Sequence, residues 1–130
     1  MIVADASAVL EVLLNTPAGT EIGRRIFAEG ETIHVPHLID VEILHALRRL
    51  DRADEIRPTR IGEILQDYFD MLLTRYPHSI LIPRIWELRH NWTSYDATYI
   101  ALAEELAAPL ITRDRAMAAN SRHRARVIVI

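Results

Sequence analysis

Three aspartates lie at junctions between apolar segments, where carboxylates could be brought together for catalysis. Asp5 follows the short apolar run 1–4, Asp114 follows the run 110–112, and Asp96 lies near the start of an apolar helical pattern. The carboxyl ends of parallel strands meet at one edge of a sheet, and ligands bind at that edge where the strand order reverses. We therefore expect Asp5 and Asp114 to project from the same edge and Asp96 to reach it. Taken singly, each aspartate is equally explained by helix capping or by the helix dipole.

Glu42 is harder to explain by local structure alone. It stands between Val41 and Ile43, and Leu38 and Ala46 lie four residues away on either side of it in a helical pattern. A buried carboxylate without a partner costs several kcal/mol, so Glu42 needs a cation or a hydrogen-bond donor. Asp40, which is two residues earlier, lies about 200° around the helix and cannot share that face.

Four carboxylates in one pocket would repel one another unless a cation lay between them. The chain has no cysteine and no histidine cluster, so the oxygen donors favour Mg²⁺ or Mn²⁺ over zinc or copper. Such a site activates water for phosphodiester hydrolysis. Ser7 and Thr112 lie two residues from Asp5 and Asp114, where their hydroxyls could orient the carboxylates, although a turn or capping role explains each equally well.

The composition predicts one globular domain over residues 1–130 and excludes several kinds of chemistry. All fifteen basic residues are arginine, which rules out Schiff-base and P-loop lysines. The net charge of −3 argues against nucleic-acid binding by overall charge, although a local basic patch remains possible. No apolar stretch approaches the roughly 20 residues of a membrane span, and no basic segment precedes the N-terminal apolar residues. We expect a cytoplasmic protein with no membrane association.

Strand-like and helix-like segments alternate along the chain, which predicts an α/β fold whose mostly parallel sheet has helices on both faces. One helix, expected at 37–50, carries apolar residues on well over half its circumference, so we expect it to be buried on most sides. The expected strands are 1–4, 32–35, 72–76, 110–112 and 127–130. The other expected helices are 6–14, 21–29, 57–70, 83–90, 94–108 and 116–119, with a break in the chain at 16–19.

The segments VADASAVL, PHLIDVEILHALRR, YDATYIALAEEL and PLITRD together resemble the PIN domain, and within it the VapC toxins of toxin–antitoxin pairs. The resemblance implies a three-layer α/β/α sandwich and a divalent-metal-dependent ribonuclease. It also implies a homodimer held inactive by a VapB-like antitoxin. The family's acidic, metal-binding site falls on the four acids considered above, with Ser7 and Thr112 at its hydroxyl positions. These acids are Asp5, Glu42, Asp96 and Asp114.

Two further groups of side chains could contact RNA. Arg113 and Arg115 flank Asp114, where they could hold substrate phosphates, although roles toward solvent or an antitoxin stay open. Trp86, Trp92 and Tyr95 could stack on unpaired bases, but we expect Trp86 and Tyr95 to belong to the core.

Two other functions compete with an RNA endonuclease toxin. A phosphatase of the haloacid dehalogenase type would use Asp5 as a nucleophile. It would also need a second aspartate where Ser7 stands, and a lysine that this chain lacks. The other alternative is a non-catalytic PIN-fold module that binds a protein partner, in which the acids only support the structure or receive arginines from the partner.

Overall fold

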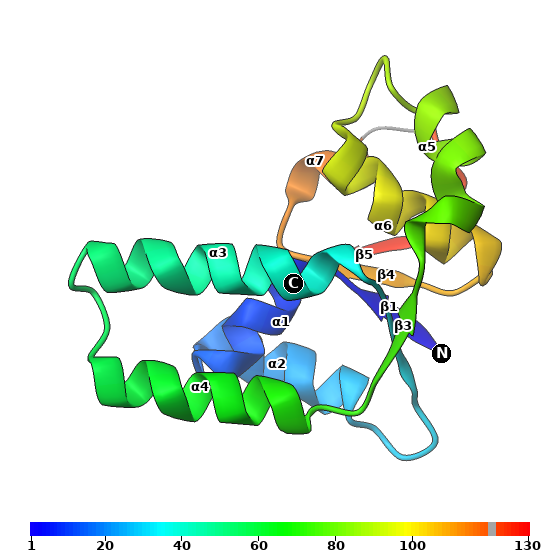
Figure 1. Cartoon of the computed structure of the whole chain (residues 1–130). Helices are drawn as coiled ribbons and strands as arrows, with labels where there is room; N and C mark the ends of the chain where they lie inside the picture. The colour runs from blue at the N-terminus through cyan, green and yellow to red at the C-terminus, as the bar shows by residue number, and fades with distance from the viewer. Residues whose placement is uncertain (120–121) are drawn as a thin grey trace.

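The fold is built on a five-stranded sheet in which every neighbouring pair of strands is parallel, in the order β3-β2-β1-β4-β5. The computed structural model describes residues 1–119 and 122–130 (Figure 1). The strands are β1 (Ile2–Ala4), β2 (Ile33–Pro36), β3 (Leu73–Tyr76), β4 (Leu110–Thr112) and β5 (Val127–Val129).

Helices cover both faces of this sheet. In Figure 1, α1 to α4 lie on one side of the strands and α5 to α7 lie on the other, which gives three layers. The predicted α/β/α sandwich with a parallel sheet is confirmed. The helices are α1 (Ala6–Leu13), α2 (Pro17–Ile26), α3 (Leu38–Arg52), α4 (Pro58–Asp70), α5 (Ile82–Glu87), α6 (Ser94–Glu105) and α7 (Arg115–Ala119), with a 3₁₀ turn η1 (His78–Leu81) before α5.

The strand order reverses between β1 and β4. The chain passes outward from β1 through β2 to β3, and then returns to add β4 and β5 on the other side of β1. Val3 lies opposite His34 on one side and Leu110 on the other. The crevice beyond the carboxyl ends of β1 and β4 is therefore the position at which parallel α/β sheets bind ligands.

The expected break at 16–19 is wrong, because these residues begin α2. Thr16 caps the helix by accepting a hydrogen bond from Gly19 N at 2.9 Å, and Pro17 occupies the first turn. Proline is tolerated there, since the first turn needs no backbone donor. Gly19 has a separate role, because a Cβ at this position would lie 2.0 Å from the carbonyl oxygen of Glu11 in α1. Glycine thus permits the close contact of α1 with α2.

The expectation that the helix at 37–50 is buried on most sides is also wrong. Its buried face consists of Ile39, Ile43 and Leu47, which recur every fourth residue. Val41 and Leu44 are 60% and 52% exposed. One apolar face of α3 therefore packs into the core, and other apolar side chains of the same helix remain exposed.

The most buried helix is α6. Every residue from 97 to 103 is buried, and four of these seven are alanine or threonine, whose small side chains let the helix pack closely against its neighbours. Thr93 caps it by accepting a hydrogen bond from Asp96 N at 3.1 Å. This cap places Asp96 in the first turn of a helix that the core holds in position. Across the described residues, no helix has the length and apolar character needed to cross a bilayer.

Candidate active site

Asp5 is a buried carboxylate with three hydrogen-bond donors. Its Oδ1 accepts hydrogen bonds from Ser7 Oγ at 2.7 Å and from Ala8 N at 2.9 Å, and its Oδ2 accepts one from Thr112 Oγ1 at 2.5 Å. Burial raises the pKa of Asp5 despite these donors, and the charge of Asp96 adds to the effect. Asp5 caps α1 as the structural interpretation predicts, and it also leaves a buried charge at the sheet edge. A capping role for Asp5 is therefore compatible with a role in binding a metal ion.

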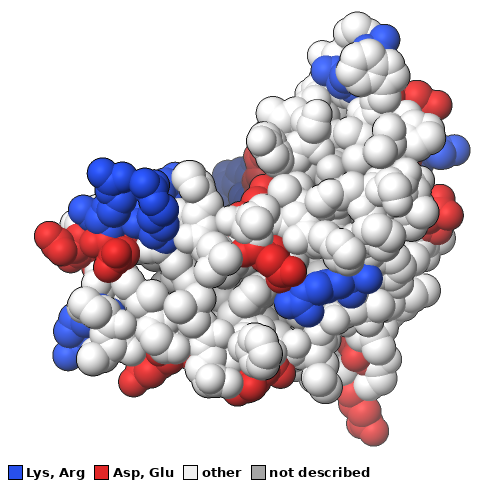
Figure 2. Space-filling view, viewed as in Figure 1, with Lys and Arg blue, Asp and Glu red and all other residues white. Residues whose placement is uncertain are grey.

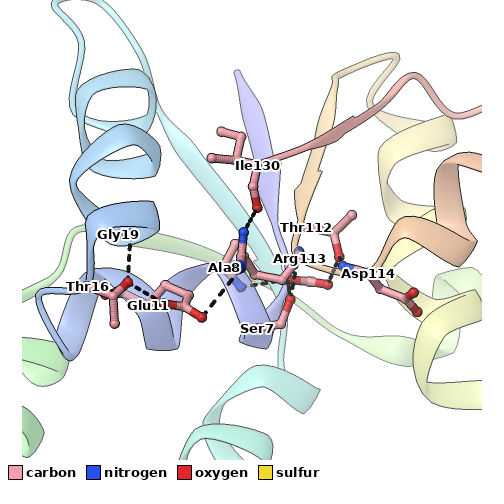
Figure 3. A network of polar contacts seen from close by, with 10 residues as sticks. Ser7, Ala8, Glu11, Thr16, Gly19, Thr112, Arg113, Asp114 and Ile130 are labelled. Carbon is pink, nitrogen blue, oxygen red and sulfur yellow. Dashed lines mark hydrogen bonds and ion pairs between the residues drawn. The ribbon is translucent and has the colours of Figure 1, made fainter.

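The end of β4 is joined to the start of α1 by the same hydroxyls. Arg113 N donates to Ser7 Oγ at 3.0 Å, and Asp114 N donates to Thr112 Oγ1 at 2.9 Å. Figure 3 shows Ser7, Thr112, Arg113 and Asp114 gathered where the two elements meet. Asp114 also caps α7, because its Oδ1 accepts a hydrogen bond from Ala116 N at 2.8 Å. Ser7 and Thr112 thus orient the backbone that carries Asp114 as well as the carboxylate of Asp5.

Glu42 has the donor that its sequence environment demands. Tyr99, in α6, donates its hydroxyl proton to Glu42 Oε2 at 2.5 Å. The side chain of Tyr99 is 2% exposed, whereas Glu42 is half-buried. Tyr99 was not among the predicted site residues. Its position three residues after Asp96, on the same face of a helix, is the signal that could have indicated it.

The four predicted acids influence one another electrostatically. Burial raises the pKa of Glu42, and the charges of Asp5 and Asp96 raise it further. Burial likewise raises the pKa of Asp96, with a contribution from the charge of Asp114. Among the described residues, none of the four acids has an arginine ion pair. The predicted acids are therefore close enough for their charges to act on one another, and no arginine ion pair among the described residues neutralises any of them.

The chemistry of this cluster fits a hard divalent cation. Its donors are carboxylate and hydroxyl oxygens, which Mg²⁺ and Mn²⁺ prefer. No three acidic or histidine side chains within 1–119 and 122–130 already stand in a metal-binding arrangement. Both oxygens of Asp5 and Oε2 of Glu42 accept hydrogen bonds, so these two residues would bind a cation through Oε1 of Glu42 and through lone pairs that the donors leave open.

The two arginines beside Asp114 differ in their surroundings. Arg113 forms an ion pair with Glu11 at 3.4 Å, and its guanidinium also donates to the carbonyl oxygen of Ile130. Arg115 is exposed and has no ion pair within the described part of the chain. Both side chains line a hollow next to β5. Phosphate binding by Arg113 would require release from Glu11, whereas Arg115 needs no such release.

The expectation that Trp86 and Tyr95 belong to the core is wrong. Trp86 is 66% exposed and Tyr95 is 63% exposed, whereas Trp92 is buried. Trp86 lies on the short helix α5, which has no buried residue, and the guanidinium carbon of Arg89 lies 4.5 Å from the centre of its ring. Tyr95 borders a groove between α1 and α3 whose walls also include Ser7 and Glu42. An exposed aromatic ring therefore lies directly beside the acidic cluster.

Comparison with known proteins agrees with this arrangement. The family model of the PIN domain matches residues 2–122. The chain is 46% identical over 114 residues to the VapC ribonuclease Mb0985 of Mycobacterium bovis, covering 88% of this chain and 86% of the relative. The chain belongs to the PIN-domain family, in its VapC group. A second VapC relative, ribonuclease VapC12 of Mycobacterium tuberculosis, is 36% identical over 130 residues, which are 100% of this chain and 99% of the relative.

Solved structures show the same PIN fold at low sequence identity. The crystal structure of PAE2754 from Pyrobaculum aerophilum has a TM-score of 0.65 at 20% identity, covering 97% of this chain and 81% of that one. VapC20 of Mycobacterium tuberculosis, described as a toxin that cleaves the sarcin–ricin loop, has a TM-score of 0.62 at 14% identity, covering 92% and 95%. At these identities the likeness concerns the fold alone.

Proposed function

We propose that this VapC-family protein is an endoribonuclease, the toxin of a toxin–antitoxin pair, and that it hydrolyses RNA phosphodiester bonds with Mg²⁺ or Mn²⁺. The observation that carries the proposal is the group of four carboxylates at the carboxyl edge of the sheet, none of which has an ion pair with an arginine in the part of the chain that the structure describes. Several relatives are named as VapC ribonucleases, which supports the reaction class. The proposed ligands are Asp5, Glu42, Asp96 and Asp114.

Each part of the site has a definable task in this reaction. When bound, a divalent cation supplies a nucleophilic water at neutral pH and neutralises charge on the phosphate. Asp5 is held rigidly by Ser7, Ala8 and Thr112, so it provides a fixed position for the cation. Asp96 approaches from the first turn of α6, and no lysine is present to share the task of charge stabilisation. Arg115, which has no ion pair in the described chain, is the better-placed phosphate ligand of the two arginines.

We also propose a homodimer and a VapB-like antitoxin partner. The VapC relatives support the antitoxin, and the exposed apolar surface supports the dimer. Leu38 N donates to His78 Nε2 at 2.8 Å, which joins the start of α3 to η1. Large, exposed apolar side chains lie on α3, η1 and α5, and Figure 2 shows a mostly uncharged surface in the region of α5 with charged side chains at its margins. They include Val41, Leu44, Ile80, Ile82 and Trp86.

The test is cleavage of a mixed pool of structured RNAs by partner-free protein in Mg²⁺, Mn²⁺ or EDTA. Discrete, metal-dependent cleavage is expected, and Asp96→Asn should slow it at least about a hundredfold. Glu105→Gln is the matched control, because Glu105 is an exposed acid on the same helix. It should cleave as the wild type does.

Two outcomes would contradict the proposal. Cleavage that survives in Asp96→Asn, or that needs no metal, would assign the activity to a contaminant. If neither protein cleaves RNA and metal does not raise the thermal stability of the wild type, the alternative of a non-catalytic protein-binding module is favoured, because a ligand that binds only the native state must stabilise it.

A further inference from the structure

The hydroxyl of Tyr99 forms the connection between the two helices that carry Glu42 and Asp96. It donates to Glu42 Oε2 at 2.5 Å, and thereby joins α6 to α3 across the site. The ring is buried, with 2% of its surface exposed, so solvent cannot replace the bond easily. Glu42 Oε1 has no hydrogen-bond partner among the described residues, so the tyrosine occupies one oxygen and leaves the other available.

A second hydrogen bond from a tyrosine to a carboxylate of α3 has a structural role. Tyr68 donates to Asp40 Oδ1 at 2.6 Å, and Arg75 forms an ion pair with the same carboxylate at 3.0 Å. The arginine neutralises Asp40 within the fold, and its hydrogen bonds hold the pKa of Asp40 below the ordinary value. Asp40 is therefore satisfied without any external ligand.

Glu42 differs from Asp40 because it receives a hydrogen bond but no compensating charge. Its only side-chain donor in the described structure is the neutral hydroxyl of Tyr99. The nearby charges are the carboxylates of Asp5 and Asp96, which disfavour ionised Glu42. The Tyr99 bond therefore fixes where the carboxylate lies while leaving its charge free to meet a cation.

The position of Tyr99 in α6 makes this bond rigid. Its neighbours Thr98 and Ile100 are buried, and the helix is enclosed over the whole run from 97 to 103. Asp96 lies three residues before it on the same helix, so one buried element both presents Asp96 and holds Glu42. A glutamate side chain has several rotatable bonds, and outer hydrogen bonds of this kind are what align metal-binding carboxylates in proteins.

We propose that Tyr99 is a positioning residue, whose hydroxyl fixes Oε2 of Glu42 so that Oε1 faces the cation shared with Asp5 and Asp96. This inference rests on the proposed metal-dependent function. Tyr99 touches neither substrate nor the reacting atoms, and it acts only through Glu42. Its loss should weaken binding of the cation more than it slows the reaction once the cation is bound.

The experiment compares Tyr99→Phe with Tyr68→Phe, because both remove one buried tyrosine hydroxyl that donates to a carboxylate of α3. Two quantities are titrated with Mn²⁺: the rise in melting temperature and the rate of RNA cleavage. Tyr99→Phe should raise the half-saturating Mn²⁺ concentration by about tenfold or more in both titrations, with the cleavage rate recovering at saturating Mn²⁺. Tyr68→Phe should lower the melting temperature of the protein without changing the half-saturating Mn²⁺ concentration.

A double-mutant comparison tests whether Tyr99 acts through Glu42. In a Glu42→Gln background, Tyr99→Phe should cause no further change in the Mn²⁺ midpoint, because the residue through which it acts has already lost its charge. An unchanged midpoint for Tyr99→Phe in the wild-type background, or equal midpoint shifts for Tyr99→Phe and Tyr68→Phe, would overturn the positioning role. If wild-type protein shows neither a Mn²⁺-dependent melting temperature nor cleavage, the proposed function fails, and the role of Tyr99 fails with it.

Discussion

Replacing Thr112 with valine tests whether buried hydroxyls stabilise the acidic site. The side chain keeps its shape but loses the hydroxyl that donates to Asp5 Oδ2 at 2.5 Å, and Thr112 is 0% exposed, so water cannot substitute. A hydrogen bond to a charged group contributes about 1.5–3 kcal/mol, and the bond from Asp114 N to Thr112 Oγ1 adds about 1 kcal/mol. The added methyl group recovers about 0.8 kcal/mol. We expect Thr112→Val to lower the free energy of unfolding by about 2–3 kcal/mol near neutral pH.

This loss should depend on pH, because the Thr112 hydroxyl stabilises ionised Asp5. Burial raises the pKa of Asp5 above 3.8, so the folded protein binds this proton more tightly than the unfolded chain does. Ionisation of Asp5 therefore reduces stability as the pH rises from 3.8 through the folded-state pKa. Removing the donor raises that pKa further, and the variant should lose more stability than wild type over this window. Near pH 4 Asp5 is mostly protonated and its hydrogen bond to Thr112 contributes only about 1 kcal/mol, so after the gain from the methyl group the difference should shrink to about 1 kcal/mol.

Urea unfolding in EDTA, at about pH 7 and about pH 4, measures both quantities. Ser7→Ala is the matched comparison, since Ser7 Oγ also donates to Asp5 but is only partly buried. Water can replace that bond, and we expect a cost of about 1 kcal/mol. Equal stability of Thr112→Val and wild type near neutral pH would refute the reasoning, and so would a loss that does not change with pH.

Two further predictions concern packing and assembly. Gly19→Ala places a Cβ 2.0 Å from Glu11 O and should cost at least about 2 kcal/mol in urea unfolding. Gly62→Ala, with nothing within 4 Å of its Cβ, should instead gain up to about 1 kcal/mol, and a neutral Gly19→Ala would contradict the close contact of α1 with α2. Val41→Asp puts a charge on the exposed apolar surface of α3 and should dissociate the proposed homodimer into monomers. Light scattering would show the lower mass, and the circular dichroism spectrum should stay unchanged. If the dissociation constant of the dimer is unchanged, the interface lies elsewhere.

The alternation of strands and helices was predictable because β1, β2 and β4 are short, mainly apolar runs that end at a proline or are followed by a charged residue. The positions of Asp5 and Asp114 after β1 and β4 followed from this pattern together with the rule for parallel sheets. The start of α2 was not predicted, since Thr16 and Pro17 suit a turn and a helix start equally well. Only the structure shows that Thr16 caps the helix, by accepting the hydrogen bond from Gly19 N.

The surroundings of individual side chains were less predictable than the elements that carry them. Trp86 and Val41 are apolar in the sequence but exposed in the structure, because composition does not reveal which face of a helix the core occupies. The partner of Glu42 was equally hidden. Its requirement for a donor or a cation followed from the sequence, but Tyr99 is 57 residues away along the chain, and only the packing of α3 with α6 identifies it.

Burial alone does not separate the acids proposed to be functional from the structural ones. The side chain of Glu104 is 5% exposed, yet Arg84 pairs with it at 2.7 Å and the pKa of Glu104 lies below its ordinary value. Asp40 likewise forms an ion pair with Arg75, and its pKa also lies below the ordinary value. By contrast, hydroxyl or backbone donors orient Asp5 and Glu42, and neither carboxylate has a positively charged partner among residues 1–119 and 122–130. A chain with fifteen arginines has ample means to neutralise these acids. That it orients them with neutral donors instead is the strongest structural argument that their charge is kept for a cation from outside the chain.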